Sequence, residues 1–84
     1  MKLLYFAHIR AKIGIAEERL DELPPGVGNV SSLVEWLKGR GPRFADALAN
    51  PRALRVAVNQ TYVGWQHPVK PGDEVAIFPP VTGG

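Results

Sequence analysis

The sequence contains no cysteine among its 84 residues. This absence excludes a disulfide scaffold, a thiolate metal site and a cysteine nucleophile. Small secreted domains usually depend on disulfides, so we expect a cytoplasmic protein. The chain also lacks a strong charge of either sign, because ten Lys and Arg stand against eight Asp and Glu, which leaves a net charge of +2. So small and dispersed an excess argues against nucleic acid as a partner.

Long hydrophobic runs are missing as well. No stretch approaches the ~20 apolar residues of a membrane span. The N-terminal segment is apolar only briefly, because His8, Arg10 and Lys12 interrupt it, and this pattern does not fit a signal peptide. We therefore expect no contact with a membrane. The composition, 45% hydrophobic and 21% charged, is that of one globular domain.

The hydrophobic pattern predicts an α+β fold in two layers. Asn29 is a natural N-cap for a helix whose apolar stripe is Val30, Leu33, Val34 and Leu37. A second, short helix is expected over residues 42–49, with Pro42 in its first turn. The expected strands are residues 2–9, 17–23, 54–59, 62–65 and 74–78. The first and last of these are the most apolar, which predicts that they lie side by side in the centre of the sheet.

The last residues raise a different possibility. A stiff Pro79–Pro80 pair follows the last predicted strand, and Val81, Thr82, Gly83 and Gly84 come after it. We predict a domain over residues 1–80 and a flexible Gly-Gly tail over residues 81–84. Glycine has no Cβ, so such a tail can pass through a narrow channel, and four residues reach at most ~14 Å. The α-carboxylate of Gly84 could be activated as an acyl-adenylate and converted to a thiocarboxylate inside another protein.

Alternation along the strands also predicts an exposed aromatic surface. With Val75 and Ile77 directed toward the helix, Phe78 lies on the opposite face of the sheet, and Phe6 has the same parity in the first strand. Exposed aromatic residues on one sheet face are typical of a partner site. Arg10 is a candidate for a polar contact at the rim.

Other candidate sites are weaker. His8 and His67 have no Cys or acidic partner at ligand spacing, so we predict no metal site. Asp73 and Glu74 are adjacent in sequence and point to opposite faces of a strand, which favours turn chemistry over acid–base catalysis. The segment "GVGNVSS" lacks the lysine of a phosphate-binding loop and is interpreted as a helix start. Trp36 and Trp65 are interpreted as packing residues.

The stretch "NQTYV…HPVKPGDEVAIFPPVTGG" closely resembles the small, sulfur-carrying subunit of molybdopterin synthase, and the resemblance extends over essentially the whole chain. It implies a ubiquitin-like β-grasp fold, with a mixed sheet of four to five strands packed on one main helix and a short helix. It also implies a hydrophobic partner interface that matches Phe6, Tyr62, Phe78, Pro79 and Pro80.

The same resemblance implies the chemistry. An activating enzyme uses ATP to adenylate Gly84, which then becomes a thiocarboxylate. The carrier docks on the large subunit of the synthase, in a heterotetramer of two small and two large subunits. Val81, Thr82 and Gly83 enter the large subunit's active site, where the sulfur is donated to cyclic pyranopterin monophosphate. The chain then binds no cofactor, and it is the sulfur-donating part of a sulfurtransferase with no catalysis of its own.

Three alternatives remain open from the sequence. A sulfur carrier for thiamine or another thiolated metabolite would form the same thiocarboxylate but dock on a different partner. A ubiquitin-like modifier would be joined through Gly84 to lysines of other proteins. A plain interaction module of this fold would have an inert tail.

Overall fold

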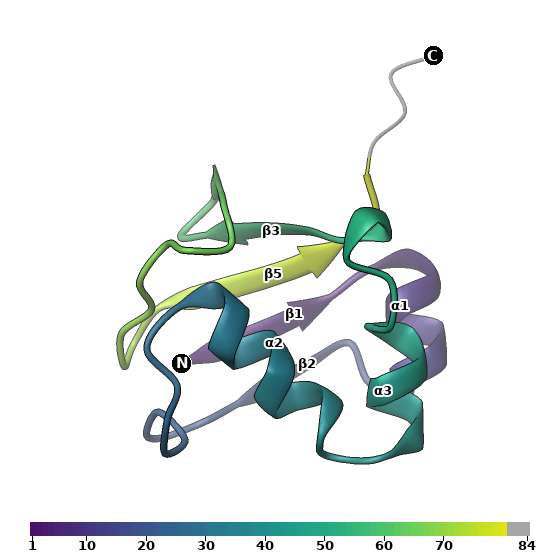
Figure 1. The fold of residues 1–84 in the computed structure, drawn as a ribbon, viewed down its shortest axis with the longest axis horizontal. Coiled ribbons are helices and arrows are strands. Elements are labelled where there is room, and N and C mark those ends of the chain that lie inside the picture. Colours follow the sequence, from purple (N-terminus) through teal and green to yellow (C-terminus); the bar gives the residue numbers. More distant parts are fainter. Residues whose placement is uncertain (81–84) are drawn as a thin grey trace.

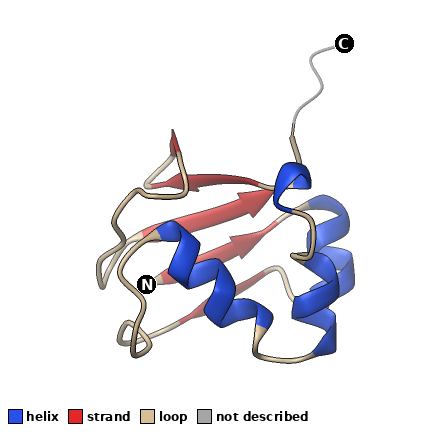
Figure 2. Ribbon diagram, in the orientation of Figure 1, coloured by secondary structure: helices blue, strands red, loops and turns tan. Residues whose placement is uncertain are grey.

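The computed structural model describes residues 1–80 of the chain. It has two layers: a mixed sheet of five strands, and helices that cover one face of it (Figures 1 and 2). No helix in the described residues is long and apolar enough to cross a membrane. The elements in chain order are β1 (Lys2–Tyr5), α1 (Ala7–Ile13), β2 (Glu17–Arg19), α2 (Val30–Lys38), α3 (Pro42–Ala47), the 3₁₀ helix η1 (Pro51–Ala53), β3 (Arg55–Val58), β4 (Thr61–Val63) and β5 (Glu74–Phe78).

The strands lie in the order β2-β1-β5-β3-β4. β1 and β5 are parallel, with Leu3 opposite Val75 and Tyr5 opposite Ile77, whereas every other pair is antiparallel. The prediction that the first and last strands are neighbours is confirmed. β5, the last strand, occupies the centre of the sheet, and the predicted mixed sheet on one main helix is confirmed.

The predicted first strand over residues 2–9 is wrong in its second half. β1 ends at Tyr5, and residues 7–13 form helix α1, which packs Ile9 and Ile13 into the core. The chain changes direction at Ala7, which has a φ of 54°, a conformation that non-glycine residues rarely adopt. Gly14 ends α1 in the left-handed conformation, with a φ of 94°. The predicted strand over residues 17–23 is also shorter, because only Glu17–Arg19 pair with β1.

Helix α2 begins as its sequence predicts. The side chain of Asn29 accepts a hydrogen bond from the Ser32 amide at 2.8 Å, and Ser32 Oγ accepts one from the Asn29 amide at 3.1 Å. This reciprocal capping box satisfies two amides that the first turn leaves free. Gly39 is the C-cap. Helix α3 starts at Pro42 as expected, whereas η1 was not predicted.

The core lies between the sheet and the helices. Val75 and Ile77 of β5 are fully buried against it, and the apolar stripe of α2 lies over them. Trp36 and Trp65 pack on its edge, as predicted. The largest fully buried side chains are Tyr5, Leu3, Ile9, Leu33, Leu37, Leu48, Leu54, Ile77, Val30 and Val75.

One polar network ties the two layers together. The hydroxyl of Tyr5 donates a hydrogen bond of 2.7 Å to Glu18 Oε2. The other carboxylate oxygen of Glu18 accepts from Arg40, whose guanidinium also lies over the rings of Trp36 and Phe44. The buried hydroxyl therefore has a partner, and the partner's charge is itself compensated.

Candidate docking site

The face of the sheet that the helices leave uncovered is apolar at one end. Alternation along β5 places Glu74, Ala76 and Phe78 on this open face, because Val75 and Ile77 are buried on the other. The register continues the row across the sheet: Ala76 lies opposite Leu4 of β1 on one side and Ala57 of β3 on the other, and Ala57 lies opposite Tyr62 of β4. Small side chains thus occupy the middle of the row, with larger ones outside.

This arrangement forms an apolar groove with a volume of about 440 Å³. We call it the aromatic groove, and its lining residues are Phe6, Tyr62, Ala76, Phe78, Pro79 and Pro80. It includes all five described residues that the sequence predicts for a partner interface. Ala76 is the addition, and its short side chain lets the groove reach down to the sheet between the larger side chains.

Two aromatic rings form one wall of the aromatic groove. The centroids of Tyr62 and Phe78 lie 5.3 Å apart, with the ring planes tilted by 45°. Tyr62 is 72% exposed, which is high for a large hydrophobic side chain in a folded domain. The tight turn at Asn59 and Gln60 fixes where Tyr62 lies, because both residues have positive φ and connect β3 directly to β4.

Phe6 forms the wall across the groove, but not as part of a strand. It is the N-cap residue of α1, in an extended conformation, and its amide donates to the carbonyl of Ile77 at 3.2 Å. This bond places it beside the end of β5. Its side chain is 45% exposed, so the predicted exposure is correct. The sequence argument for this exposure was alternation along a strand, but β1 ends at Tyr5 and Phe6 is not part of it.

The positions that carry the predicted chemistry lie outside the described residues. These are Gly84, the predicted site of activation, and Val81, Thr82 and Gly83, which are predicted to enter a partner's active site. The structure describes the segment that leads to them: Pro79 and Pro80 follow β5 directly and line the aromatic groove. A partner that binds the groove therefore also contacts Pro80, the residue directly before the segment 81–84.

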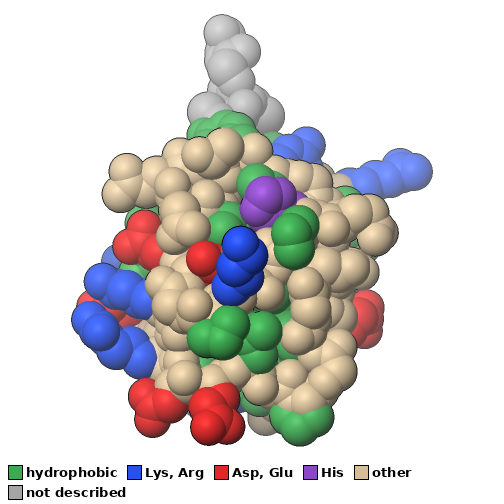
Figure 3. Space-filling model, turned by 90° about the vertical axis from the view of Figure 1, so that its left-hand side faces the viewer, with side chains coloured by type: hydrophobic (Ala, Val, Ile, Leu, Met, Phe, Trp, Pro, Cys, Tyr) green, Lys and Arg blue, Asp and Glu red, His purple; other side chains and the backbone are tan. Residues whose placement is uncertain are grey.

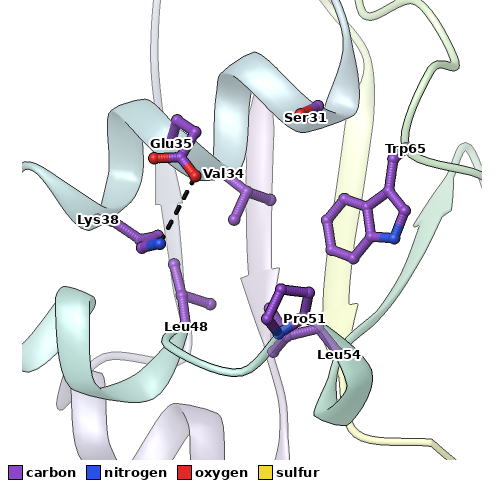
Figure 4. A pocket seen from close by; sticks show the side chains of 8 residues that line it. All are labelled: Ser31, Val34, Glu35, Lys38, Leu48, Pro51, Leu54 and Trp65. Carbon is purple, nitrogen blue, oxygen red and sulfur yellow. Dashed lines mark ion pairs between the residues drawn. The ribbon is translucent and has the colours of Figure 1, made fainter.

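A second cavity lies on the helical side of the molecule, with a volume of about 210 Å³ (Figure 4). It opens between α2 and the segment around η1, where Val34 and Trp65 face one another, and Pro51 and Leu54 lie below them. Its rim carries an ion pair of 3.5 Å between Lys38 and Glu35. These contacts describe packing at the edge of the core, so we assign the cavity no role.

The remaining titratable groups form no catalytic cluster. Within the described residues, no group of three or more His, Asp or Glu is placed to hold a metal ion. Burial, together with the hydrogen bond to Glu18, raises the pKa of Tyr5 above its usual range. Figure 3 shows acidic and basic side chains beside one another on one face of the molecule.

Asp73 has the turn role that the sequence predicts. Its carboxylate accepts hydrogen bonds from the Lys70 amide at 2.9 Å and from the Asn59 side chain at 3.1 Å. Slight burial acts to raise the pKa of Asp73, but these bonds and the charges of Lys70 and His67 outweigh it and lower the pKa. Asn59 in turn accepts from the Glu74 amide, so the network joins the β3–β4 turn to the start of β5.

Comparisons with known proteins agree with this fold. The chain is 42% identical to the molybdopterin synthase sulfur carrier subunit of Escherichia coli, over all of this chain and 99% of that one. Among solved structures it is similar to a putative molybdopterin converting factor, subunit 1, from Pyrococcus furiosus, with 38% identity, a TM-score of 0.73 and 95% of each chain covered.

A second solved structure extends the likeness. SAMP1 from Haloferax volcanii shares 26% identity, with a TM-score of 0.73 over all of this chain and 98% of that one. These neighbours confirm the predicted ubiquitin-like β-grasp fold. The ThiS family matches residues 3–84, a span that takes in both the aromatic groove and the final glycines. The chain is thus a member of the ThiS family.

Proposed function

We propose that this chain is the sulfur carrier subunit of molybdopterin synthase, acting in molybdenum cofactor biosynthesis. The observation that carries the proposal is the aromatic groove, which lies directly before residues 81–84 in a chain that is similar over its whole length to such subunits. The groove supplies a docking surface, and Gly84 supplies the reactive group. The chain acts in the cytoplasm as part of a sulfur-transferring enzyme.

The chemistry begins at the carboxylate of Gly84. One of its oxygens attacks the α-phosphorus of ATP in an activating enzyme, which releases pyrophosphate and leaves an acyl-adenylate. Sulfur at the oxidation level of hydrosulfide then displaces AMP, so that the chain ends in a thiocarboxylate. Its sulfur is a strong nucleophile and forms a bond to a carbon of cyclic pyranopterin monophosphate in the large subunit; water then hydrolyses the resulting thioester, which leaves the sulfur on the pterin and returns Gly84 as a carboxylate. ATP belongs to the activating enzyme, and this chain binds no cofactor.

The carrier's own contribution is position. Docking through Phe6, Tyr62 and Phe78 fixes the base of the segment, because Pro79 and Pro80 belong to the same groove. Proline restricts the backbone at this base, whereas Gly83 and Gly84 add no side chain to a narrow entrance. Residues 81–84 then reach at most ~14 Å beyond the groove. We propose that two carriers bind a dimer of large subunits.

The test combines partner recovery with intact-mass analysis. The chain is produced in cells that also contain its activating enzyme, and its mass is compared with that of a Gly84 deletion variant. We expect one oxygen to be replaced by sulfur in the full chain only, and we expect the large subunit of molybdopterin synthase to be recovered with it. An unmodified full chain would refute the proposal.

Two other outcomes would redirect the assignment. Recovery of a thiazole synthase in place of the large subunit would identify a carrier for thiamine synthesis. Isopeptide conjugates joined through Gly84 to lysines would identify a protein modifier. Neither alternative changes the role of the groove, because each requires a partner that binds the domain next to its final residues.

A further inference from the structure

The charges on the open face of the sheet are divided between its two ends. The acidic residues of this face are Glu17 and Glu74: Glu17, opposite Leu4 in the register, forms an ion pair with Lys2 at 3.3 Å, and Glu74 is the register partner of Lys2. Arg19 also lies opposite Lys2, so two cations and two carboxylates balance on this part of the face. The aromatic groove lies at the other end, where β5 finishes.

Arg55 is the charged residue at the groove end of the face. It is the first residue of β3 and lies directly opposite Phe78 in the register. Alternation places its side chain on the open face, because Val56 on the next position is buried. Directly opposed residues of antiparallel strands have Cβ atoms about 5 Å apart, so Arg55 borders the groove.

The guanidinium of Arg55 is held in place without losing its charge. Its Nη1 donates to the Leu54 carbonyl at 2.8 Å and more weakly to the Arg52 carbonyl at 3.4 Å. These neutral carbonyls orient the guanidinium but do not neutralise its positive charge. No ion pair within residues 1–80 involves Arg55, whereas Lys2, Lys12, Lys38 and Arg40 all have one.

Arg10 supplies a second cation on the opposite wall. Its amide donates to the Phe6 carbonyl at 3.2 Å, so it lies one helical turn beyond Phe6 and on a similar face of α1. It too is exposed and forms no ion pair among the described residues. Figure 1 shows that α1 and the start of β3 both adjoin the end of β5.

The segments that line the groove contain no acidic side chain to offset these two cations. Residues 1–16, 47–72 and 75–84 contain no Asp or Glu, and these segments supply every residue of the groove lining. Outside these segments, Glu17, whose register partner Leu4 lies beside Ala76, is paired with Lys2 at 3.3 Å, and Asp46 is paired with Lys12 at 3.5 Å. An apolar groove with an uncompensated cation on each side fits a partner surface with carboxylates on each side of an apolar centre.

We infer that Arg55, with Arg10 across the groove, docks on carboxylates of the large subunit and steers its approach. This inference rests on the proposed function, because it names a feature of the same partner. Exposed charge pairs at a rim add little affinity singly, but together they raise the association rate. The groove itself buries apolar surface, and this contact governs dissociation. A protein fits better than a nucleic acid, since the groove between these two cations is lined by apolar and aromatic residues.

The experiment measures association and dissociation rates of the full chain with the large subunit, at about 50 mM and about 300 mM salt. Arg55→Gln keeps N–H donors for the Leu54 carbonyl while removing the charge, and Arg10→Gln is combined with it. We expect association to slow by about fivefold or more at low salt, with dissociation nearly unchanged. The double variant Arg10→Glu with Arg55→Glu should weaken binding by at least about tenfold.

The matched control is Arg19→Glu on β2, where Arg19 lies opposite Lys2. It lowers the net charge by two, as the double Gln variant does, but at a position away from the groove. It should associate at nearly the wild-type rate. If wild type binds but both Arg variants associate as fast as it does, the inference is overturned and the proposed function stands. If wild type does not bind the large subunit at all, the proposed function fails. Binding of single-stranded RNA that both variants abolish would also overturn the inference.

Discussion

Tyr62 and Phe78 come from adjacent parts of the open sheet face and lie 5.3 Å apart, ring centroid to ring centroid, with Tyr62 72% exposed. Neither ring belongs to the core cluster on the helical side of the sheet. These two side chains contribute little to the core and adjoin the segment before residues 81–84, so we expect them to be more important for binding than for folding.

Replacing Phe78 by Ala is therefore expected to separate binding from stability. The free energy of unfolding should fall by only about 1–2 kcal/mol, because the side chain is half-buried and loses one aromatic contact. Binding to the large subunit should weaken by about 2 kcal/mol or more, as for a central aromatic anchor. Chemical denaturation and titration calorimetry measure the two quantities.

Ile15→Ala is the control for this prediction. Ile15 is also an exposed hydrophobic residue, at 42%, but it does not line the aromatic groove. Its replacement should leave partner affinity unchanged. Equal losses of affinity in the two variants would mean that the groove is not the docking site.

The turn between β3 and β4 offers a stabilising substitution. Gln60 has a φ of 70° and follows Asn59, whose φ is 51°. Two consecutive positive values define the turn type that prefers Asn-Gly, and a side chain in this region carries strain. Gln60→Gly should raise the free energy of unfolding by about 0.5–1 kcal/mol, which thermal denaturation would detect. Gln66→Gly is the control. Gln66 is also exposed but does not have a positive φ, so this substitution should not raise the free energy of unfolding.

Tyr5 predicts a loss of stability in alkali. Burial and the bond to Glu18 raise the pKa of Tyr5 in the folded protein above its usual value of 10.0. The neutral phenol is therefore favoured by folding, and its contribution is complete below pH 10 and declines as the pH rises toward the folded value. The free energy of unfolding should fall by up to about 1.4 kcal/mol per pH unit in this window.

Tyr5→Phe isolates this effect. The variant should be about 0.5–1.5 kcal/mol less stable at neutral pH, because Glu18 loses a donor. Above pH 10 the difference should shrink, since only the wild type has a buried phenol to ionise. If the free energies of unfolding of the two proteins differed by the same amount at every pH up to and above 10, the raised pKa of Tyr5 would be contradicted.

Asp73 predicts the opposite behaviour in acid. Although slight burial opposes it, hydrogen bonding from Asn59 and Lys70 lowers the pKa of Asp73 below its usual 3.8. Its contribution to stability is present above that value and is lost as the pH falls through the folded pKa. Asp73→Ala should be less stable than wild type at neutral pH and equal to it in strong acid. Asp21→Ala, on an exposed residue, should show no such convergence.

The sequence predicted the elements that have a clear period and a clear cap. Asn29 and the apolar stripe after it fixed α2, and alternation in residues 74–78 fixed which face of β5 is buried. Helix α1 was missed because Leu3, Tyr5, Ala7 and Ile9 alternate by chance across its start. The four-residue spacing of Ile9 and Ile13 was the available signal for a helix. A helix of seven residues shows this spacing only once, which is too little to outweigh the strand pattern that precedes it.

Only part of the candidate site could be predicted, because some of its residues come together through strand order and register. Parity along a strand identified Phe78, and resemblance to a family supplied Tyr62. The role of Ala76 depends on strand order, since it becomes the base of a groove only when Leu4 and Ala57 lie beside it. Arg55 depends on register in the same way: sequence alone does not place it opposite Phe78.

The central place of β5 has a consequence for synthesis. The strand that joins β1 to β3 is the last of the described strands to leave the ribosome, so the sheet has no continuous centre until residues 74–78 have emerged. A nascent chain that breaks off earlier has neither a finished fold nor Phe78. A chain released before residues 74–78 have been made therefore lacks both the central strand of the sheet and one wall of the aromatic groove.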